Sequence, residues 1–587
     1  MKRRGHRIDY DAEPPMPREY CPMVSWYDPA ELMRSARDVF ISTVLGRHSD
    51  RRLLEAMVSK EPVQPFDCTT EPLPWNRTGP FWFDYLSDTG DGFNSTYTMA
   101  ACVSRDLHVT ECGGGGKLQL NQGSLLVLGG DQVYPTASRF EYHRRFVGPF
   151  RAALPEAREP RPKVFAIPGN HDWYDSLVSF TRLFISRARI GGWDAPQKRS
   201  YFALKLPYGW WLIGTDTQLD SDIDKPQVDF FREAARKIEP GDRVILCTAE
   251  PHWIYASKYR GMDPEYTENN LRFLEEEVLG RKIAVFLAGD LHHYRRHAAP
   301  DGTQKITAGG GGAFLHPTHG IDVRVLSERD SQGRIERRFE LKAAFPDEAT
   351  SRRLTWLNLL LPYRNPTFGL LTAVLYAMTA WASKAPIGRI DDLPSAVYVS
   401  LVMAIQDPFR AFWSVNTVLL FWLFTDTHSR PYRIIMGFLH GAAHLVVTFL
   451  LGWKALAFTE GTLGIEEPLL QTLVMVGLTG LAGWSIGPII VGIYLLISLN
   501  LFGRHDNEAF SSLAIQDYKQ FLRMKIDDDG TLTIFPVGVR RVARRWKART
   551  ASGAGPALEP DDARATEPEL IEPPVRVAGP GGGGAVS

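Results

Sequence analysis

Four segments of the sequence each end an apolar run with side chains that could hold metal ions. In every case small residues lie next to carboxylate, amide or imidazole groups, in "SDTGDG" (87–92), "GDQVY" (130–134), "GNHD" (169–172) and "GDLHH" (289–293). Buried polar atoms need partners, and a cation serves as one for several oxygen and nitrogen atoms at once. The carboxyl ends of strands in an α/β sheet form a crevice where ligands collect, so we expect the segments to converge there.

The elements that would position these segments are buried strands. Before about residue 350, short apolar runs such as "FWFDYLS", "SLLVLGG", "KVFAIP" and "KIAVFLAG" alternate with polar, helix-like segments. This alternation predicts a mixed α/β domain in which each motif follows a strand.

The composition of the whole chain restricts its function in a few ways. Lys and Arg together number 67, as do Asp and Glu, so the formal net charge is zero and we expect no nucleic-acid binding. The five cysteines are scattered and lack metal-ligand spacing, which indicates a reducing compartment. The first 20 residues lack the apolar core of a signal peptide, so we expect the first domain to stay in the cytoplasm.

After about residue 350 the sequence contains long segments that are almost free of charge. They lie near or above the ~18 to 20 apolar residues that cross a bilayer. The four segments are 367–382, 412–424, 434–453 and 469–499. We therefore expect about four transmembrane helices.

The loops between these segments predict their orientation. "GRIDDLPS" and "TEGTLGIEEP" are acidic, whereas "HSRPYR" and the residues after "FGRH" are basic, so the positive-inside rule predicts that the basic set and the first domain lie in the cytoplasm. The fourth segment is long for one helix and contains Gly483, Gly487 and Pro488. A kink or a tight hairpin is therefore an open alternative, and a hairpin would move the tail outside.

The four polar segments, in this order, resemble the motifs of the calcineurin-like metallophosphoesterases, which include purple acid phosphatases and cyclic-nucleotide phosphodiesterases. They correspond to the family's blocks D-x-H, G-D, G-N-H-D/E and G-H-x-H. The resemblance covers roughly residues 80 to 320. Any one motif would be weak, but four in the family's order, each after an apolar strand, are specific.

The resemblance implies a four-layer α/β/β/α sandwich with two metal ions that share a carboxylate and activate a water. It implies that Asp131 bridges the two ions. Asp88 and His292 would bind one of them, and Asn170 would bind the other through its amide oxygen.

The resemblance also implies two residues that act on the substrate. His171 would lie near the phosphate, where it stabilises charge or protonates the leaving oxygen. Asp172 would orient the His171 ring.

The sequence departs from the family pattern in three places. Gly90, followed by Asp91, stands where the first motif has histidine, and Asp290 stands where the last motif has its first histidine. Asp91 is either a ligand or part of a turn. The block "VILCTAEPHW" offers Glu250 and His252 as ligands, and the sequence does not choose between them.

A site rich in carboxylates favours hard cations. Two divalent ions, manganese or iron, are therefore the expected cofactors, with zinc or magnesium as alternatives. The glycines of "AGGGGA" (308–313) either approach the site or form a flexible turn. His440 and His444 share one helix face, and we favour a packing role over a functional one.

These observations predict a membrane-anchored metallophosphoesterase that hydrolyses a phosphomonoester or phosphodiester, with a substrate that could be lipid-linked and a bilayer as partner. The alternative is a catalytically degenerate metal-binding or sensing domain that regulates its own membrane region. The predicted parts are a partly helical extension (1–75), the metallophosphoesterase domain (76–345), transmembrane helices (355–503), a cytoplasmic segment (504–548) and a disordered tail (549–587).

Overall fold

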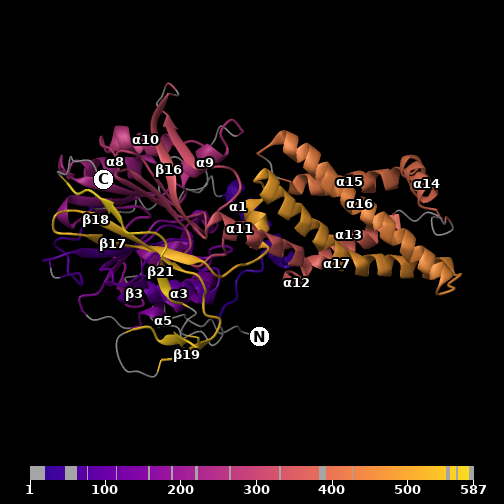
Figure 1. The fold of residues 1–587 in the computed structure, drawn as a ribbon, viewed down its shortest axis with the longest axis horizontal. Helices are drawn as coiled ribbons and strands as arrows, with labels where there is room; N and C mark the ends of the chain where they lie inside the picture. The colour runs from indigo at the N-terminus through magenta and orange to yellow at the C-terminus, as the bar shows by residue number, and fades with distance from the viewer. Residues whose placement is uncertain are drawn as a thin grey trace, which may run out of the picture.

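The computed structural model of the chain consists of a globular α/β part from which a bundle of long helices projects (Figure 1). The predicted extension 1–75 lies partly outside the residues that the structure describes. These are 20–45, 63–75, 77–113, 115–155, 159–186, 189–217, 223–262, 266–329, 332, 334–382, 390, 392–425, 428–549, 555–562 and 566–580.

Within the described residues, two large mixed β-sheets form the globular part. Sheet 1 contains, in spatial order, β1 (Phe66–Asp67), β9 (Phe202–Leu206), β10 (Trp210–Gly214), β11 (Arg243–Cys247), β12 (Val285–Ala288), β14 (Gln304–Ala308), β13 (Tyr294–Ala298), β16 (Ile335–Phe345) and β15 (Val325–Arg329). Sheet 2 contains β4 (Lys117–Leu120), β3 (Leu107–Thr110), β21 (Pro568–Leu570), β18 (Leu532–Val539), β17 (Lys519–Ile526), β2 (Phe81–Leu86), β5 (Leu125–Leu128), β6 (Lys163–Ala166), β8 (Trp193–Asp194) and β7 (Arg189–Ile190), with β22 (Val575–Val577) paired to β18.

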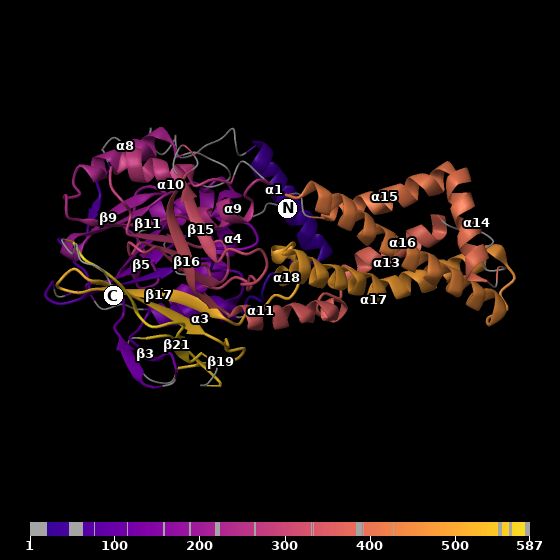
Figure 2. The same ribbon diagram turned by 45° about the horizontal axis from the view of Figure 1, so that its top comes forward.

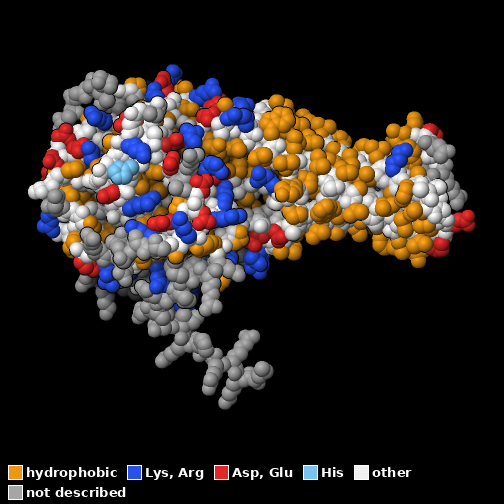
Figure 3. Space-filling model, turned by 60° about the horizontal axis from the view of Figure 1, so that its bottom comes forward, with side chains coloured by type: hydrophobic (Ala, Val, Ile, Leu, Met, Phe, Trp, Pro, Cys, Tyr) orange, Lys and Arg blue, Asp and Glu red, His pale blue; other side chains and the backbone are white. Residues whose placement is uncertain are grey.

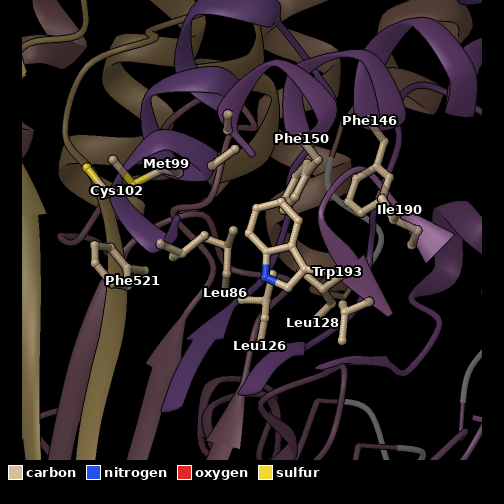
Figure 4. Close-up of a cluster of buried hydrophobic side chains, with 14 of the residues drawn as sticks. Leu86, Met99, Cys102, Leu126, Leu128, Phe146, Phe150, Ile190, Trp193 and Phe521 are labelled. Atoms are coloured by element: carbon tan, nitrogen blue, oxygen red, sulfur yellow. The ribbon is translucent and has the colours of Figure 1, made fainter. Parts of the chain in front are cut away.

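The two sheets face each other across an apolar core, and helices cover their outer faces. Phe83 of sheet 2 and Ile245 of sheet 1 are both fully buried in the shared core. On the outer face of sheet 2, Phe150 packs near Trp193 and Leu128 (Figure 4). The covering helices are α3 (Phe93–Val103) and α5 (Gly148–Ala153) on sheet 2, and α8 (Lys225–Ala235), α9 (His252–Lys258) and α10 (Asn269–Phe273) on sheet 1. The mixed α/β sandwich predicted from the sequence is confirmed.

Parallel pairing brings the motif segments to common edges. In sheet 2, β2 pairs in parallel with β5, and β5 with β6, so the segments that follow these strands leave from the same edge. In sheet 1, β11 and β12 are likewise parallel. Each of these strands is short and fully or almost fully buried, so the first polar residues after it lie at its carboxyl end.

The sandwich is not continuous in sequence, because strands from after the long helices return to it. β17 pairs along its length with β18 and with β2, the strand that precedes the first motif. Arg523 of β17 forms a buried ion pair with Asp84 of β2, with an Nε to Oδ1 distance of 2.8 Å. The prediction from the sequence that the domain ends at residue 345 is therefore wrong. The long helices are an insertion into the domain.

The predicted disordered tail is a second correction. Within 549–587, the described residues include β20 (Leu558–Pro560), β21 and β22. β20 pairs with β19 (Trp546–Ala548), while β21 and β22 both pair with β18 of sheet 2. Pro, Gly and acidic residues suggested disorder, but here they connect short strands whose apolar side chains, such as Leu570 and Val577, are buried. The last seven residues, 581–587, lie outside the described part.

Five long helices form the projecting bundle (Figure 2), counted over the residues that the structure describes between 368 and 502. They are α13 (Phe368–Ala382), α14 (Leu393–Gln406), α15 (Pro408–Phe424), α16 (Arg430–Gly461) and α17 (Pro468–Phe502). Apolar side chains cover the visible face of this bundle, whereas charged side chains lie over the globular part and at the far tip (Figure 3). Helices α11 (Glu348–Thr355) and α12 (Leu361–Arg364) connect β16 to the bundle.

In the described part of the chain, two of these helices, α16 and α17, are long and apolar enough to cross a membrane. α13 and α15 pack beside them but have 15 and 17 residues, and a 15-residue helix rises only about 23 Å. α17 is one helix that contains Pro488, so the hairpin considered from the sequence is absent from residues 468–502. Because β17 rejoins the sheet of β2, the chain enters and leaves the bundle at the end next to the globular part.

Small residues and histidines of the bundle serve close packing. A Cβ atom on Gly483 would lie 2.6 Å from the Tyr376 side chain, and the Thr372 hydroxyl donates to the Gly483 carbonyl at 2.9 Å, so α13 and α17 approach closely at this glycine. The Tyr376 hydroxyl lies 2.9 Å from His444 Nδ1, and the His440 ring stacks on Tyr494. These contacts agree with the packing role favoured for the two histidines.

Candidate active site

Three aspartates of the motif segments share an unusual backbone conformation. Asp88, Asp131 and Asp290 have φ values of +59°, +49° and +64°, in the left-handed region that non-glycine residues rarely adopt. Each lies two or three residues after the last residue of its strand. Backbone of this kind persists only where surrounding contacts hold it, and it gathers at functional sites.

Hydrogen bonds join the motifs to one another. The Asp290 backbone N–H donates to both carboxylate oxygens of Asp88, at 3.1 and 2.9 Å. The His171 backbone N–H donates to Asp131 Oδ1 at 2.9 Å. The segments after β2, β5, β6 and β12 therefore converge, as the sequence predicted.

A tyrosine hydroxyl lies at the centre of this convergence. The Tyr134 oxygen is 3.0 Å from Asp88 Oδ1, 3.2 Å from Asp131 Oδ2 and 2.9 Å from His292 Nε2. His292 Nδ1 lies 2.8 Å from the Phe314 carbonyl, so this nitrogen carries the proton and Nε2 is an acceptor. One hydroxyl proton thus faces several acceptors, an arrangement that a cation between them would relieve.

Sequence reasoning missed Tyr134, although it ends the quoted segment "GDQVY". The available signal was its position, three residues after Asp131, which is near enough for both side chains to meet at one point.

Asn170 and Asp290 lie beside Asp88 and Asp131. Both are half-buried and line a narrow gap together with Asp88, Asp131 and the backbone of Gly130, Gly169 and Ala249. The Asn170 amide nitrogen donates to the Tyr174 hydroxyl at 3.1 Å, which leaves the amide oxygen as the free acceptor. Asp290 Oδ2 accepts a hydrogen bond from the Tyr255 hydroxyl.

The electrostatics of the gap also fit a cation. Burial, followed by repulsion from Asp131 and Asp290, raises the pKa of Asp88 well above its usual value. Burial and repulsion from Asp290 raise the pKa of Asp131 to about 8. Burial raises the pKa of Asp290 as well. Without positive charge in the gap, Asp131 would therefore bind a proton near neutral pH.

The donor set is mixed in chemistry. In the described residues, no cluster of three or more His, Cys, Asp and Glu side chains could hold a metal ion by itself. The phenol of Tyr134 and the amide of Asn170 add further oxygen atoms beside these carboxylates and His292. Oxygen donors dominate this set, as hard cations prefer.

His171 lies at the cavity side of the gap, but Asp172 does not orient its ring as predicted. The His171 Nδ1 atom is 2.6 Å from the Pro135 carbonyl, which fixes the ring and leaves Nε2 for other contacts. Burial lowers the pKa of His171 to about 4. The Asp172 carboxylate instead accepts from the Gly169 and Gln132 backbone N–H groups, and its role is to hold the loop.

Asp91 sits in the turn that the sequence offered as the alternative to ligation. Its Oδ1 accepts from the Val24 N–H at 2.8 Å and its Oδ2 from the Phe314 N–H at 3.0 Å. Both oxygens are therefore used to tie two other chain segments to the loop after β2.

Glu250 and His252 have different surroundings. Glu250 contributes to raising the pKa values of Tyr174 and Tyr255, which line the cavity beside Asp290. The His252 ring instead lies near Lys305, and burial lowers its pKa to about 4. Its Nε2 atom is buried with no hydrogen-bond partner in the described residues.

The glycines at 309–312 lie beneath the site. The Gly311 N–H donates to the Ser87 carbonyl at 2.9 Å, and a Cβ atom on Gly311 would come within 2.2 Å of that oxygen. Larger residues would push this loop away from the segment that carries Asp88. The close-approach interpretation is therefore the one that the contacts favour.

A cavity of about 380 Å³ opens from the gap toward the helical bundle. Asp131, Asn170, His171 and Asp290 line its inner end. Its outer end is lined by Lys258 of α9 and by residues of α18 (Asp506–Ser511), the helix that follows α17. Lys258 and Asp506 form an ion pair, and the Tyr259 ring stacks on His428 between α15 and α16. Figure 2 shows α18 at the junction of the two parts.

Comparison with known proteins gives the class of this domain. Residues 82–294 match the family model of calcineurin-like phosphoesterases. No curated protein matches the chain. Among solved structures, a purple acid phosphatase from yellow lupin (Lupinus luteus) is 14% identical, with a TM-score of 0.29 over 45% of this chain and 54% of the other. A PhoD structure is 12% identical, with a TM-score of 0.26 over 40% of this chain and 58% of the other.

The match covers β2, β5, β6 and β12, and it includes all four motif segments. The chain therefore contains a calcineurin-like phosphoesterase domain. This match supports a hydrolase that acts on phosphate esters with the help of divalent metal ions. The chain spans only a little over half the length of the two solved proteins.

Proposed function

We propose that the protein is a membrane-anchored phosphoesterase with a dinuclear metal site at the gap around Asp131. The observation that carries this proposal is the Tyr134 hydroxyl, which faces Asp88, Asp131 and His292 within 3.2 Å. Phenolate, carboxylate and imidazole are all metal ligands once they are deprotonated.

The residues divide into two sets that share Asp131. Asp88, Tyr134 and His292 form the inner set, and Asn170 and Asp290 form the outer set. Asp91 and His252 are left out, because both Asp91 oxygens are engaged and His252 lies near Lys305. The oxygen-rich donors favour manganese or iron, with magnesium and zinc as alternatives.

When bound, the two ions would polarise the phosphoryl oxygens and lower the pKa of an attacking water. The protein's own groups do the rest. The Pro135 carbonyl accepts a hydrogen bond from His171 Nδ1–H, which leaves Nε2 to face the cavity. The neutral ring only accepts at Nε2, so transfer of a proton to the leaving oxygen requires that Nε2 first bind a proton from solvent, which the negative charge of a bound ester favours. Asn170 and Asp290 of the outer set are half-buried and line the cavity, so a phosphate that enters the cavity can contact them.

The convergence of the ligands supports catalysis over the degenerate regulator. An Asp290 side chain that pointed away from the other ligands would have favoured that alternative. Instead, Asp290 lines the gap with Asp88 and Asp131 and contacts Asp88 through its backbone N–H.

The position of the cavity supports a membrane-proximal substrate, such as a lipid-linked phosphate ester. Its outer wall includes Asp506, Asn507 and Ser511, which follow the last long helix directly. A substrate held in the bilayer would reach the gap through this end. By the positive-inside rule, the basic loops support a cytoplasmic position for the catalytic domain and for both ends of the bundle.

The test is hydrolysis of p-nitrophenyl phosphate and bis-(p-nitrophenyl) phosphate by the purified full chain, stripped of metal and reloaded with manganese. Asp131→Asn and His171→Ala are measured beside it. We expect metal-dependent turnover that both variants lose, and the better probe distinguishes monoesters from diesters. No turnover with manganese, iron, magnesium or zinc in a folded protein would contradict the proposal.

A further inference from the structure

A segment that precedes the family domain forms one wall of the cavity. Residues 20–28 lie well before residue 82, where the match to calcineurin-like phosphoesterases begins. Trp26 of this segment nevertheless lines the same cavity as Asp131, Asn170 and His171. The family resemblance assigns no role to this wall.

Several contacts fix the segment in place. The Val24 N–H donates to Asp91, and the Phe93 N–H donates to the Cys21 carbonyl at 2.9 Å. On the far side of Trp26, the Tyr27 hydroxyl donates to the Glu508 carbonyl of α18 at 3.0 Å. Trp26 is therefore held between the loop after β2 and the helix that follows the bundle.

The Trp26 ring packs edge-on against groups of the site. Its centroid lies 6.0 Å from that of His171, 6.2 Å from that of Tyr134 and 5.6 Å from that of Phe314. Phe314 in turn packs 4.9 Å from His292, centroid to centroid. Trp26 and Phe314 thus form a continuous aromatic wall beside both ligand sets.

The indole nitrogen of Trp26 is buried and has no hydrogen-bond partner in the described residues. An indole N–H can only donate, and a buried donor without an acceptor is costly. Trp82 has the same unpaired N–H, but its ring stacks on Phe535 and does not line the cavity. The difference is that Trp26 lines the cavity beside Asp131 and His171, whereas Trp82 does not.

We propose that Trp26 is a substrate-binding residue. Its N–H donates to a phosphate-ester oxygen, and its ring, with Phe314, contacts the organic group beside the scissile phosphate. This would select esters whose alcohol is aromatic or aliphatic over small polar ones. The inference rests on the proposed function, because it needs phosphate to bind at the gap.

The first test measures binding of inorganic phosphate to the manganese-loaded full chain by calorimetry. We compare the wild type with Trp26→Phe, which keeps the ring and removes the N–H, and with the matched control Trp82→Phe. We expect about tenfold weaker phosphate binding for Trp26→Phe only, since a hydrogen bond to a charged group is lost. Equal phosphate affinity in wild type and Trp26→Phe would overturn the inference, and so would weaker binding that accompanies loss of manganese.

The second test is the preference between phenyl phosphate and glycerol phosphate. Trp26→Ala should lose most of the wild-type preference for the phenyl ester through a higher KM, whereas Trp26→Phe should keep it. An unchanged preference in Trp26→Ala would overturn the role of the ring. A wild type that binds phosphate but hydrolyses no ester would overturn only the proposed function, because phosphate binding does not require turnover. A wild type that binds no phosphate would overturn both.

Discussion

The inner and outer halves of the candidate metal site differ in burial and in what holds them. Asp88 and His292 of the inner half are almost fully buried, and Tyr134 joins them at one point. Asn170 and Asp290 of the outer half are only half-buried and face the cavity. The difference predicts that an ion in the inner half would be released more slowly than an ion in the outer half, which faces the cavity.

Asp131 belongs to both halves, so its substitution should have the largest effect. Asp131→Asn removes the shared charge, and we expect a loss of at least about 10³-fold in kcat, since both ions contribute to stabilising the transition state. Steady-state kinetics with bis-(p-nitrophenyl) phosphate measures this loss. Retention of more than a tenth of the wild-type kcat would show that the halves do not share this carboxylate.

Tyr134→Phe tests the inner half alone. Removing the phenol oxygen should weaken binding of one ion by about 100-fold, while the ring keeps its packing against Trp26 and His171. Metal titration monitored by calorimetry separates the two binding events. Tyr142→Phe is a control of the same kind, because that hydroxyl bonds Asp172 and not the ligand sets. If both metal-binding events in Tyr134→Phe keep their wild-type affinities, Tyr134 is not a metal ligand.

Tyr255→Phe tests the outer half, with a smaller expected effect. The Tyr255 hydroxyl donates to Asp290 Oδ2 and so orients a ligand without being one. We expect about tenfold more manganese for half-maximal activity, with kcat restored at saturating metal. A lower kcat that excess manganese does not restore would mean that Tyr255 acts on the substrate and not through Asp290.

The sequence predicted the inner half better than the outer one. Asp88, Asp131 and His292 follow strands in motifs of the expected order, and they converge as anticipated. Asp91 lay in such a motif too, yet its oxygens bind backbone N–H groups of Val24 and Phe314, residues too distant in sequence for spacing to reveal. Tyr134 was overlooked because a tyrosine near a motif resembles a core residue until its hydroxyl is placed.

The fold was predictable in its first half and not in its last. Buried strands with apolar patterns identified the α/β domain up to residue 345. β17 returns to β2 through long-range strand pairing and the Asp84–Arg523 ion pair, neither of which carries a local signal. The tail beyond residue 549 has the composition of a disordered segment, but β21 and β22 add to an edge that β18 already provides.

The most direct measurement is the metal content of the full chain during dialysis against a chelator, by elemental analysis of manganese-loaded wild type. The proposed site predicts close to two ions per chain at the start, with loss of one, at the half-buried outer half, before the other. In Tyr134→Phe, both ions should leave together. A wild type that never holds more than one ion, or that loses two ions at one rate, would contradict a dinuclear site with unequal halves.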